Sequence, residues 1–137
     1  MNNDTRTATG ELEVKMTPEA VDPGEAGVTL SRLAIDKHYH GDLDATGTGV
    51  MLSATTAVRG SAGYAAMERV SGALHGRRGS FVLQHAGTMT RGASHLDIAI
   101  VPDSGTGELA DITGVCGITI VDGKHFYTLQ YTLEAKA

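Results

Sequence analysis

Two side chains of the sequence combine in a way that suits acid–base chemistry: Glu68 and His85. A carboxylate beside an imidazole can hold the histidine in one tautomer and make it a general acid or base, and burial shifts both groups toward proton transfer near neutral pH. The alternative is a buried polar network that fixes strand register, with Glu68 bonded to Lys37, Arg69 or a backbone amide. We predict Glu68 and His85 as candidate catalytic residues, and both interpretations place them inside the protein.

A second group of residues could bind a ligand. Tyrosines give a wall that is apolar in its body and polar at its tip, which suits a small hydrophobic molecule carrying one or two oxygens. Core packing is the alternative role for the same side chains. The predicted ligand contacts are Tyr39, Tyr64, Lys37, Cys116, Tyr127 and Tyr131.

Three further motifs are weaker. Cys116 is the only cysteine, and without a nearby base a buried cysteine is usually a small hydrophobe rather than a nucleophile. His38 and His40 have a spacing that can start a zinc site, but their strand face points outward and no third ligand follows at a suitable distance. The loop at 102–109 is glycine-rich but lacks the lysine of a phosphate-binding loop. We therefore expect no metal and no cofactor.

The elements that position these residues are strands. Apolar and polar residues alternate with period two, no segment has a helical stripe over three turns, and 18 glycines are spread along the chain. The predicted strands are 7–16, 28–39, 43–53, 62–74, 80–90, 95–101, 112–121 and 124–133.

The last two strands allow a test of register. Asp122-Gly123 between alternating runs is a strong signal for a two-residue hairpin turn. This turn places the apolar positions of both strands on one face and sets an aromatic side chain opposite a glycine. The predicted pairs are Val121 with Lys124, Ile120 with His125, Ile118 with Tyr127, Cys116 with Leu129, and Gly114 with Tyr131.

The same test places His85, and not Gln84, on the inner face. With HGRRG as the turn, Leu74 pairs with Phe81, Val70 with His85 and Glu68 with Gly87, so that Glu68 is a diagonal neighbour of His85, about 7–8 Å away between backbones. A three-residue turn at 40–42 likewise predicts pairs of Tyr39 with Leu43, Ile35 with Gly47 and Leu33 with Gly49. Lys37 then lies on the same inner face.

Eight short antiparallel strands with one apolar face and no helix to cover it are best satisfied by closing the sheet, which also removes exposed edges. We predict an all-β fold, a single eight-stranded antiparallel β-barrel, whose interior is just wide enough for side chains or for one small ligand. A β-sandwich is the alternative.

Three segments carry a resemblance to known proteins: AGYAAMERVSGALHGRRGSFVLQHAGTM (62–89), VPDSGTGELADITG (101–114) and DGKHFYTLQYTL (122–133). They resemble a family of short bacterial proteins of unknown function, and the resemblance extends over most of the chain from about residue 30. It implies an allene-oxide-cyclase-like, calycin-like β-barrel. The sequence departs from that pattern at Asp111 and at Val115-Cys116, and the second departure argues against a catalytic Cys116 by analogy with plant cyclases.

Length and composition limit the partners. The 137 residues suit one domain, expected at 7–137 after a flexible N-terminus at 1–6, with a second flexible segment at 17–27. A net charge of −5 without a basic run argues against nucleic acid, and no stretch approaches the roughly 20 apolar residues of a membrane span. The N-terminus lacks an export signal, so we expect a cytoplasmic protein.

Three functions fit these observations. The first is a small soluble barrel that binds a hydrophobic, oxygen-bearing molecule in its lumen. The second is an isomerase or cyclase that uses Glu68 and His85 in the same pocket, where the barrel orients a reactive substrate and excludes water. The third is a structural protein with a filled barrel that works as a homo-oligomer, a dimer or trimer, through outward residues such as Val50, Leu52 and Val115.

Overall fold

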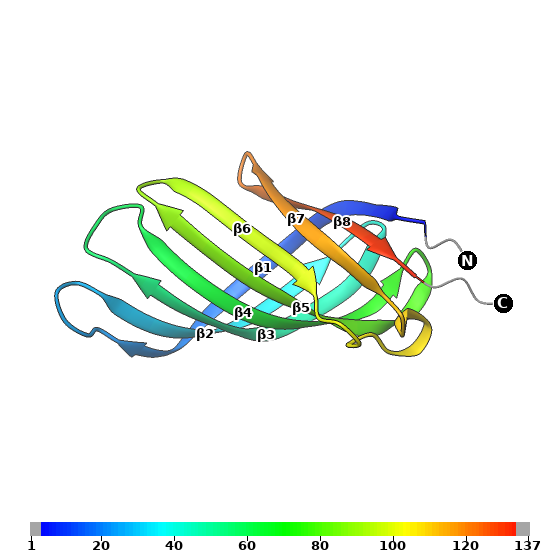
Figure 1. The fold of residues 1–137 in the computed structure, drawn as a ribbon, viewed down its shortest axis with the longest axis horizontal. Helices are drawn as coiled ribbons and strands as arrows, with labels where there is room; N and C mark the ends of the chain where they lie inside the picture. Colours follow the sequence, from blue (N-terminus) through cyan, green and yellow to red (C-terminus); the bar gives the residue numbers. More distant parts are fainter. Residues whose placement is uncertain (1–3, 134–137) are drawn as a thin grey trace.

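Eight antiparallel strands form a closed barrel, in which each strand pairs with the next and β8 pairs with β1 (Figure 1). The structure, a computed structural model, describes residues 4–133. The elements are β1 (Arg6–Asp22), β2 (Thr29–Tyr39), β3 (Leu43–Thr55), β4 (Ala62–Leu74), β5 (Arg77–Thr90), β6 (Ala93–Ile100), the short 3₁₀ helix η1 (Gly107–Leu109), β7 (Thr113–Val121) and β8 (Lys124–Thr132). The predicted all-β barrel is confirmed, and the sandwich alternative is wrong.

The first strand is longer than predicted. β1 continues to Asp22, so the expected flexibility is wrong for 17–22, which belong to a strand. The register with β2 shifts between Pro18 and Ala20, and such a bulge accommodates a proline that cannot donate a ladder hydrogen bond. At the ends, Arg6 already belongs to β1, whereas residues 1–3 of the expected flexible N-terminus and 134–137 of the expected domain lie outside the described residues.

The hairpin of β7 and β8 has the predicted register. Val121 pairs with Lys124 and Cys116 with Leu129, and the remaining pairs follow as expected down to Gly114 with Tyr131. Asp122 and Gly123 have φ values of 50° and 79°, so both turn residues are left-handed, as a type I′ turn requires.

The register of two other hairpins was predicted wrongly. The β4–β5 turn consists of His75-Gly76, with φ values of 45° and 82°, and pairs Leu74 with Arg77 instead of Phe81. In the β2–β3 hairpin Tyr39 pairs with Ala45 instead of Leu43. These shifts are four and two positions, and an even shift leaves every side chain on its predicted face. His85 is therefore inward and 5% exposed, although it pairs with Ala66 rather than Val70.

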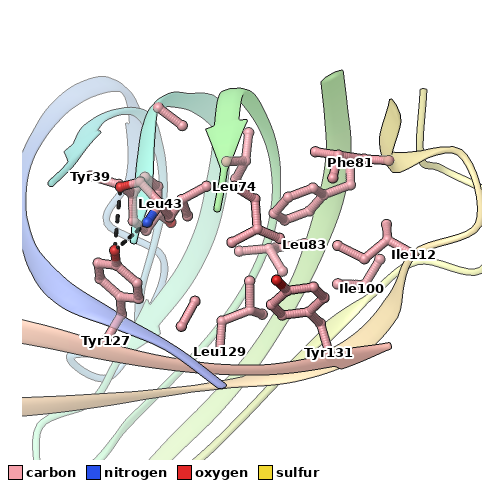
Figure 2. Packing of buried hydrophobic residues seen from close by; sticks show 14 of the residues in the cluster. Tyr39, Leu43, Leu74, Phe81, Leu83, Ile100, Ile112, Tyr127, Leu129 and Tyr131 are labelled. Atoms are coloured by element: carbon pink, nitrogen blue, oxygen red, sulfur yellow. Dashed lines mark hydrogen bonds between the residues drawn. The ribbon is translucent and has the colours of Figure 1, made fainter. Parts of the chain in front are cut away.

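One end of the barrel is filled by side chains. Figure 2 shows tyrosine, phenylalanine and aliphatic side chains of many strands meeting in this packed end, among them Tyr39, Tyr127, Tyr131 and Phe81. Leu109 of η1 and Ile112 are each 1% exposed and belong to the same cluster, so the long β6–β7 connection covers this end of the lumen.

The tyrosine hydroxyls of the packed end hold turns. Tyr127 Oη accepts a hydrogen bond from the Leu43 amide at 2.9 Å and donates to the His40 carbonyl at 2.9 Å, which fixes the β2–β3 turn. Tyr131 Oη lies 2.5 Å from Nδ1 of His75 in the β4–β5 turn. These side chains join distant strands through polar tips while their rings fill the core.

The opposite end is less tightly closed. Inward side chains there are exposed, with Met16 at 42%, Leu96 at 39% and Ile120 at 62%. The β6–β7 ladder has two paired positions among the described residues, Ile98 with Cys116 and Ala99 with Val115. Toward this end β6 and β7 are therefore unpaired, which leaves a seam in the barrel wall. Within residues 4–133, no helix is long and apolar enough to cross a membrane.

We expect Tyr127→Phe to lower the free energy of unfolding by about 1–3 kcal/mol, because it leaves the buried Leu43 amide without its acceptor. Tyr64→Phe is the matched control, since Tyr64 is only partly buried and lies away from these turns. Urea unfolding of both variants measures the difference. Equal loss of stability in the two variants would contradict the role of the Tyr127 hydroxyl.

Candidate functional site

The carboxylate of Glu68 is the centre of a cluster of polar side chains in the lumen. Glu68 is 0% exposed on β4. Its Oε1 accepts hydrogen bonds from Lys37 Nζ at 2.9 Å and lies 2.8 Å from His85 Nε2, and its Oε2 accepts from Tyr39 Oη at 2.6 Å. Since an ionised carboxylate only accepts hydrogen bonds, Nε2 of His85 carries the hydrogen. We name Lys37, Tyr39, Glu68 and His85 the Glu68 cluster.

A glycine on β3 makes room for this carboxylate. A Cβ atom at Gly47 would collide with Oε2 of Glu68 and would also crowd the ring of Tyr39. Gly47 pairs directly with Lys37 across the β2–β3 ladder. The Glu68 cluster therefore depends on a missing side chain as well as on its four members.

The electrostatics of the cluster favour an ionised Glu68. Burial by itself would raise the pKa of Glu68, but the hydrogen bond from His85, the charge of Lys37 and the hydrogen bond from Tyr39 together lower it below its ordinary value. Burial and the neighbouring Glu68 charge raise the pKa of Tyr39, so this phenol stays protonated and donates. The result is a desolvated anion with three donors.

A cavity of about 180 Å³ borders the cluster on the side away from the packed end. Lys37 and His85 line it, whereas Glu68 and Tyr39 do not, so Glu68 acts on the cavity through its partners. The remaining wall is mostly apolar: Leu12, Val14, Met16, Ile35, Met51, Tyr64, Ala66, Leu96, Ile98, Ile118, Ile120 and His125.

The predicted site residues thus lie in two different parts of the lumen. It joins Glu68, His85, Lys37 and Tyr39 through hydrogen bonds, and it places Tyr64 in the cavity wall. The other two predicted tyrosines, Tyr127 and Tyr131, lie in the packed end with hydroxyls that hold turns, so we do not place them among the ligand contacts.

Cys116 lies near the cluster without joining it. Its thiol is half-buried, and Sγ lies 3.7 Å from the Gly117 carbonyl. Burial is the main cause that raises the pKa of this thiol to about 12. A thiol that stays protonated at neutral pH is a packing group and not an activated nucleophile.

The other motifs lie outside the lumen. The rings of His38 and His40 stack at 4.3 Å on the outer face, and His40 Nε2 lies 2.6 Å from Oε1 of Glu13. The glycine-rich loop at 102–109 forms part of the β6–β7 connection, where the Thr106 and Ser104 hydroxyls accept from backbone amides of β5. Both motifs therefore have a structural explanation.

Sequence reasoning missed the apolar residues of the cavity wall and one polar residue, His125. His125 pairs with Ile120, and both line the cavity. The correctly predicted β7–β8 register already placed His125 on the inner face, so that register could have identified it. The side chains of Met16 and Met51 gave no comparable signal, because the sequence does not show which part of a lumen stays empty.

A larger and more open groove lies apart from the Glu68 cluster. It has a volume of about 550 Å³ and runs over parts of β1, β2, β3 and β4, with Leu30, Leu52 and Arg32 in its lining. It contains no buried ionisable group comparable to Glu68. The lumenal cavity is smaller, but both Lys37 and His85 of the Glu68 cluster line it, and we take it as the candidate site.

The fold and the site together define a closed antiparallel barrel with a buried ionic cluster beneath a small apolar cavity. Residues 8–131 match the family described as "Protein of unknown function (DUF3224)", and the chain belongs to this family. The chain is similar to a crystal structure of a protein of unknown function of the same family from Shewanella oneidensis MR-1. The two share 49% identity with a TM-score of 0.90, over 96% of this chain and 100% of the other. No curated protein matches the chain.

We expect Glu68→Gln to cost about 3–5 kcal/mol of folding stability at neutral pH, because it leaves the buried Lys37 ammonium without its counter-charge. The folded pKa of Glu68 is lowered, so its contribution is present above the ordinary pKa of 4.5 and is lost as pH falls through the folded value. The difference between wild type and variant should therefore shrink below about pH 4.5.

Urea unfolding between pH 3 and pH 8 measures this difference, in steps of about half a pH unit. Glu25→Gln is the matched control, because Glu25 is exposed in the β1–β2 connection and its substitution should change stability little at any pH. A difference that stays constant over the whole range would show that the charge of Glu68 does not stabilise the fold.

Proposed function

We propose that this protein binds a small, mostly apolar molecule with at least one oxygen in the lumenal cavity, with Lys37 and His85 as polar contacts. The observation that carries the proposal is the position of these two side chains, which are held by the buried Glu68 and border an otherwise apolar cavity. Ligand sites commonly combine an apolar wall with a few fixed polar groups.

The size of the cavity limits the ligand. A volume of about 180 Å³ is well below the roughly 300–1,000 Å³ of pockets for drug-sized molecules. The cavity therefore suits a small molecule, or one end of a longer one whose remainder lies toward the mouth.

The seam between β6 and β7 supports access to this cavity. Leu96 and Ile98 on β6 and Ile118 and Ile120 on β7 line the cavity on either side of the seam. Beyond the pair of Ile98 with Cys116 the two strands do not form a ladder toward the mouth. An apolar molecule can pass along these side chains without separating paired strands.

Ala66→Phe tests this proposal, because Ala66 lies in the cavity wall and a phenyl ring would fill part of the space. Ala65→Phe is the matched control, since Ala65 is the next residue on the same strand and points outward. We expect binding of 1-octanol, measured by titration calorimetry, to weaken at least tenfold in Ala66→Phe and to persist in Ala65→Phe. Equal binding in both variants would place the ligand outside the lumen.

Native mass spectrometry of protein purified from its own host extends this test to the natural ligand. We expect an added mass that is lost on denaturation and reduced in Ala66→Phe. Ala65→Phe should retain the added mass, which separates occupation of the lumen from nonspecific adhesion.

A second candidate function is proton transfer on a carbonyl compound bound in the same cavity. The observation that favours it is the orientation of His85, whose Nε2 is held by Glu68 while the ring borders the cavity. In a carbonyl compound with a carbon–carbon double bond next to the acidic carbon, His85 would remove a proton from the carbon between the two groups, and the electron pair would move to the oxygen near Lys37. The proton would then return to the far carbon of the double bond, which shifts the double bond into conjugation with the carbonyl. Such an isomerisation needs no co-reactant, and Glu68 would be a positioning residue.

This second function predicts that the protein accelerates exchange of the hydrogens beside the carbonyl of 2-octanone in D₂O. We expect His85→Gln to remove the acceleration and His95→Gln, an exposed outward substitution on β6, to retain it. Proton NMR of the ketone follows the exchange. A wild-type rate equal to that of buffer would exclude proton abstraction from this ketone and leave the binding function standing.

The third function predicted from sequence, a filled barrel that works through an oligomer interface, is less well supported by the cavity. Outward apolar residues do exist, with Leu52 58% and Val115 53% exposed, so a dimer or trimer stays a prediction. Scattered exposed apolar residues are normal on protein surfaces.

A further inference from the structure

The unused hydrogen-bond donors and acceptors at the inner end of the cavity determine which ligand head group fits there. A lysine ammonium has three N–H donors, and Lys37 directs one at Glu68. His85 uses Nε2 for Glu68, and among residues 4–133 no partner contacts its Nδ1. Glu68 itself is 0% exposed, so its oxygens present no acceptor to the cavity. The inner end therefore offers two lysine donors and one imidazole nitrogen.

Charge balance further limits which ligand head group the cavity can bind. The ammonium of Lys37 and the carboxylate of Glu68 cancel each other at 2.9 Å. An anion in this apolar cavity needs one additional positive charge, because an uncompensated charge in a low-dielectric site is strongly unfavourable. Histidine is the side chain that most readily gains a proton near neutral pH, and protonation of Nδ1 would supply that charge at the point where the anion binds.

His125 also lines the cavity, but it has no hydrogen bond to Glu68 or Lys37, so His85 is the histidine that lies beside the Lys37 ammonium. The ionisable side chains that face His85 from the surrounding strands are Lys37 and Tyr39 on β2, Tyr64 and Glu68 on β4, Cys116 on β7 and His125 on β8. Burial raises the pKa of Tyr39, Tyr64 and Cys116, so these three stay neutral. The inward residues of β1, β3 and β6 around the cavity are apolar or glycine.

We propose that the ligand head is a carboxylate that binds together with one proton, with Lys37 Nζ donating to one oxygen and the protonated Nδ1 of His85 donating to the other. This inference rests on the proposed function, since it names the ligand class of the same cavity. A single negative charge matches the single proton that His85 can add. A phosphate dianion would leave a second charge without a partner, and an alcohol would use only part of the donors.

The exposed apolar residues at the mouth of the cavity indicate that the ligand also has an apolar tail. Met16, Leu96 and Ile120 line the cavity and are 42%, 39% and 62% exposed, so an aliphatic chain that extends from the inner end would cover them. Burial of this apolar surface stabilises such a complex. The ligand class is therefore an aliphatic carboxylate longer than the cavity itself.

Titration calorimetry with octanoate and 1-octanol tests the inference, because the two probes share a chain and differ in the head group. Measurements in two buffers of different ionisation enthalpy give the number of protons taken up. For octanoate we expect uptake that approaches one proton per ligand at alkaline pH, and a dissociation constant that rises about tenfold per pH unit there. For 1-octanol we expect no uptake and no dependence on pH between pH 6 and pH 8.5.

Three histidine variants assign the proton, and a fourth variant tests the lysine contact. His85→Gln should abolish proton uptake on octanoate binding, whereas His125→Gln in the cavity wall and the outward His95→Gln should retain it. Lys37→Met should weaken octanoate more than 1-octanol. Because His85→Gln or Lys37→Met could disturb folding, the proton uptake of the wild type, which needs no variant, is the primary measurement.

The outcomes separate the two proposals. Binding of octanoate with proton uptake that depends on His85 supports the inference. Binding of 1-octanol with equal or weaker binding of octanoate and no proton uptake overturns the carboxylate but leaves the lumenal ligand site. Proton uptake that disappears in His125→Gln and persists in His85→Gln overturns the assignment of the proton. Failure of both probes to bind overturns the proposed function and the inference together.

Discussion

The burial of the Glu68 carboxylate is the constraint on which the rest of the lumen depends. An ionised carboxylate without water is costly, and only close donors and a counter-charge compensate it. Lys37 and Tyr39 from β2 and His85 from β5 provide them, so three strands are tied to one pair of oxygens. Within residues 4–133, every side-chain nitrogen or oxygen atom that is itself fully covered in a residue that is not exposed has a hydrogen-bond partner. The cluster therefore specifies the register of β2, β4 and β5 as well as the chemistry of the cavity.

The barrel divides into two halves around this cluster. On one side large aromatic and aliphatic side chains fill the lumen (Figure 2). The hydroxyls of Tyr127 and Tyr131 hold the turns that close this side. On the other side the inward positions include small residues, such as Gly87 and Ala66, and the space is left partly empty. Gly87 pairs with Tyr64, and a Cβ atom at Gly87 would collide with the tyrosine ring. Tyr64 can therefore lie against the sheet and form wall instead of filling the lumen.

The sequence predicts which side chains face the lumen better than it predicts which residues pair between strands. The period of two identifies the inward residues of a strand even when its register is predicted wrongly, provided that the register error is an even number of positions. The errors in the β2–β3 and β4–β5 registers are even, so Glu68, His85 and Lys37 lie inside as the sequence predicts. Asp122-Gly123 fixes one register because few turns fit such a dipeptide. HGRRG is ambiguous: His75 adopts a positive φ without being glycine, which a residue-based prediction of the turn does not anticipate.

The division into a packed half and a hollow half is harder to predict, for a physical reason. Whether a lumen is filled depends on the summed volume of side chains from eight strands at one height in the barrel, and that height follows from register and shear, not from local pattern. An error of two positions moves a side chain by about two residue rises of roughly 3.4 Å along its strand. Tyr127 and Tyr131 illustrate the effect, because they are inward as predicted but lie at the height of the packed end.

Stability and candidate function meet in the same side chains. Lys37 and His85 neutralise and hydrogen-bond Glu68 on one side and border the cavity on the other, so the contacts that stabilise the buried carboxylate also orient the two groups that face a ligand. Such preorganised groups need little rearrangement when a ligand binds, which favours affinity. It also means that substitutions within the cluster change folding and binding together. The wall residues, which touch the cavity but not Glu68, are the positions where binding can change while the ionic cluster keeps its geometry.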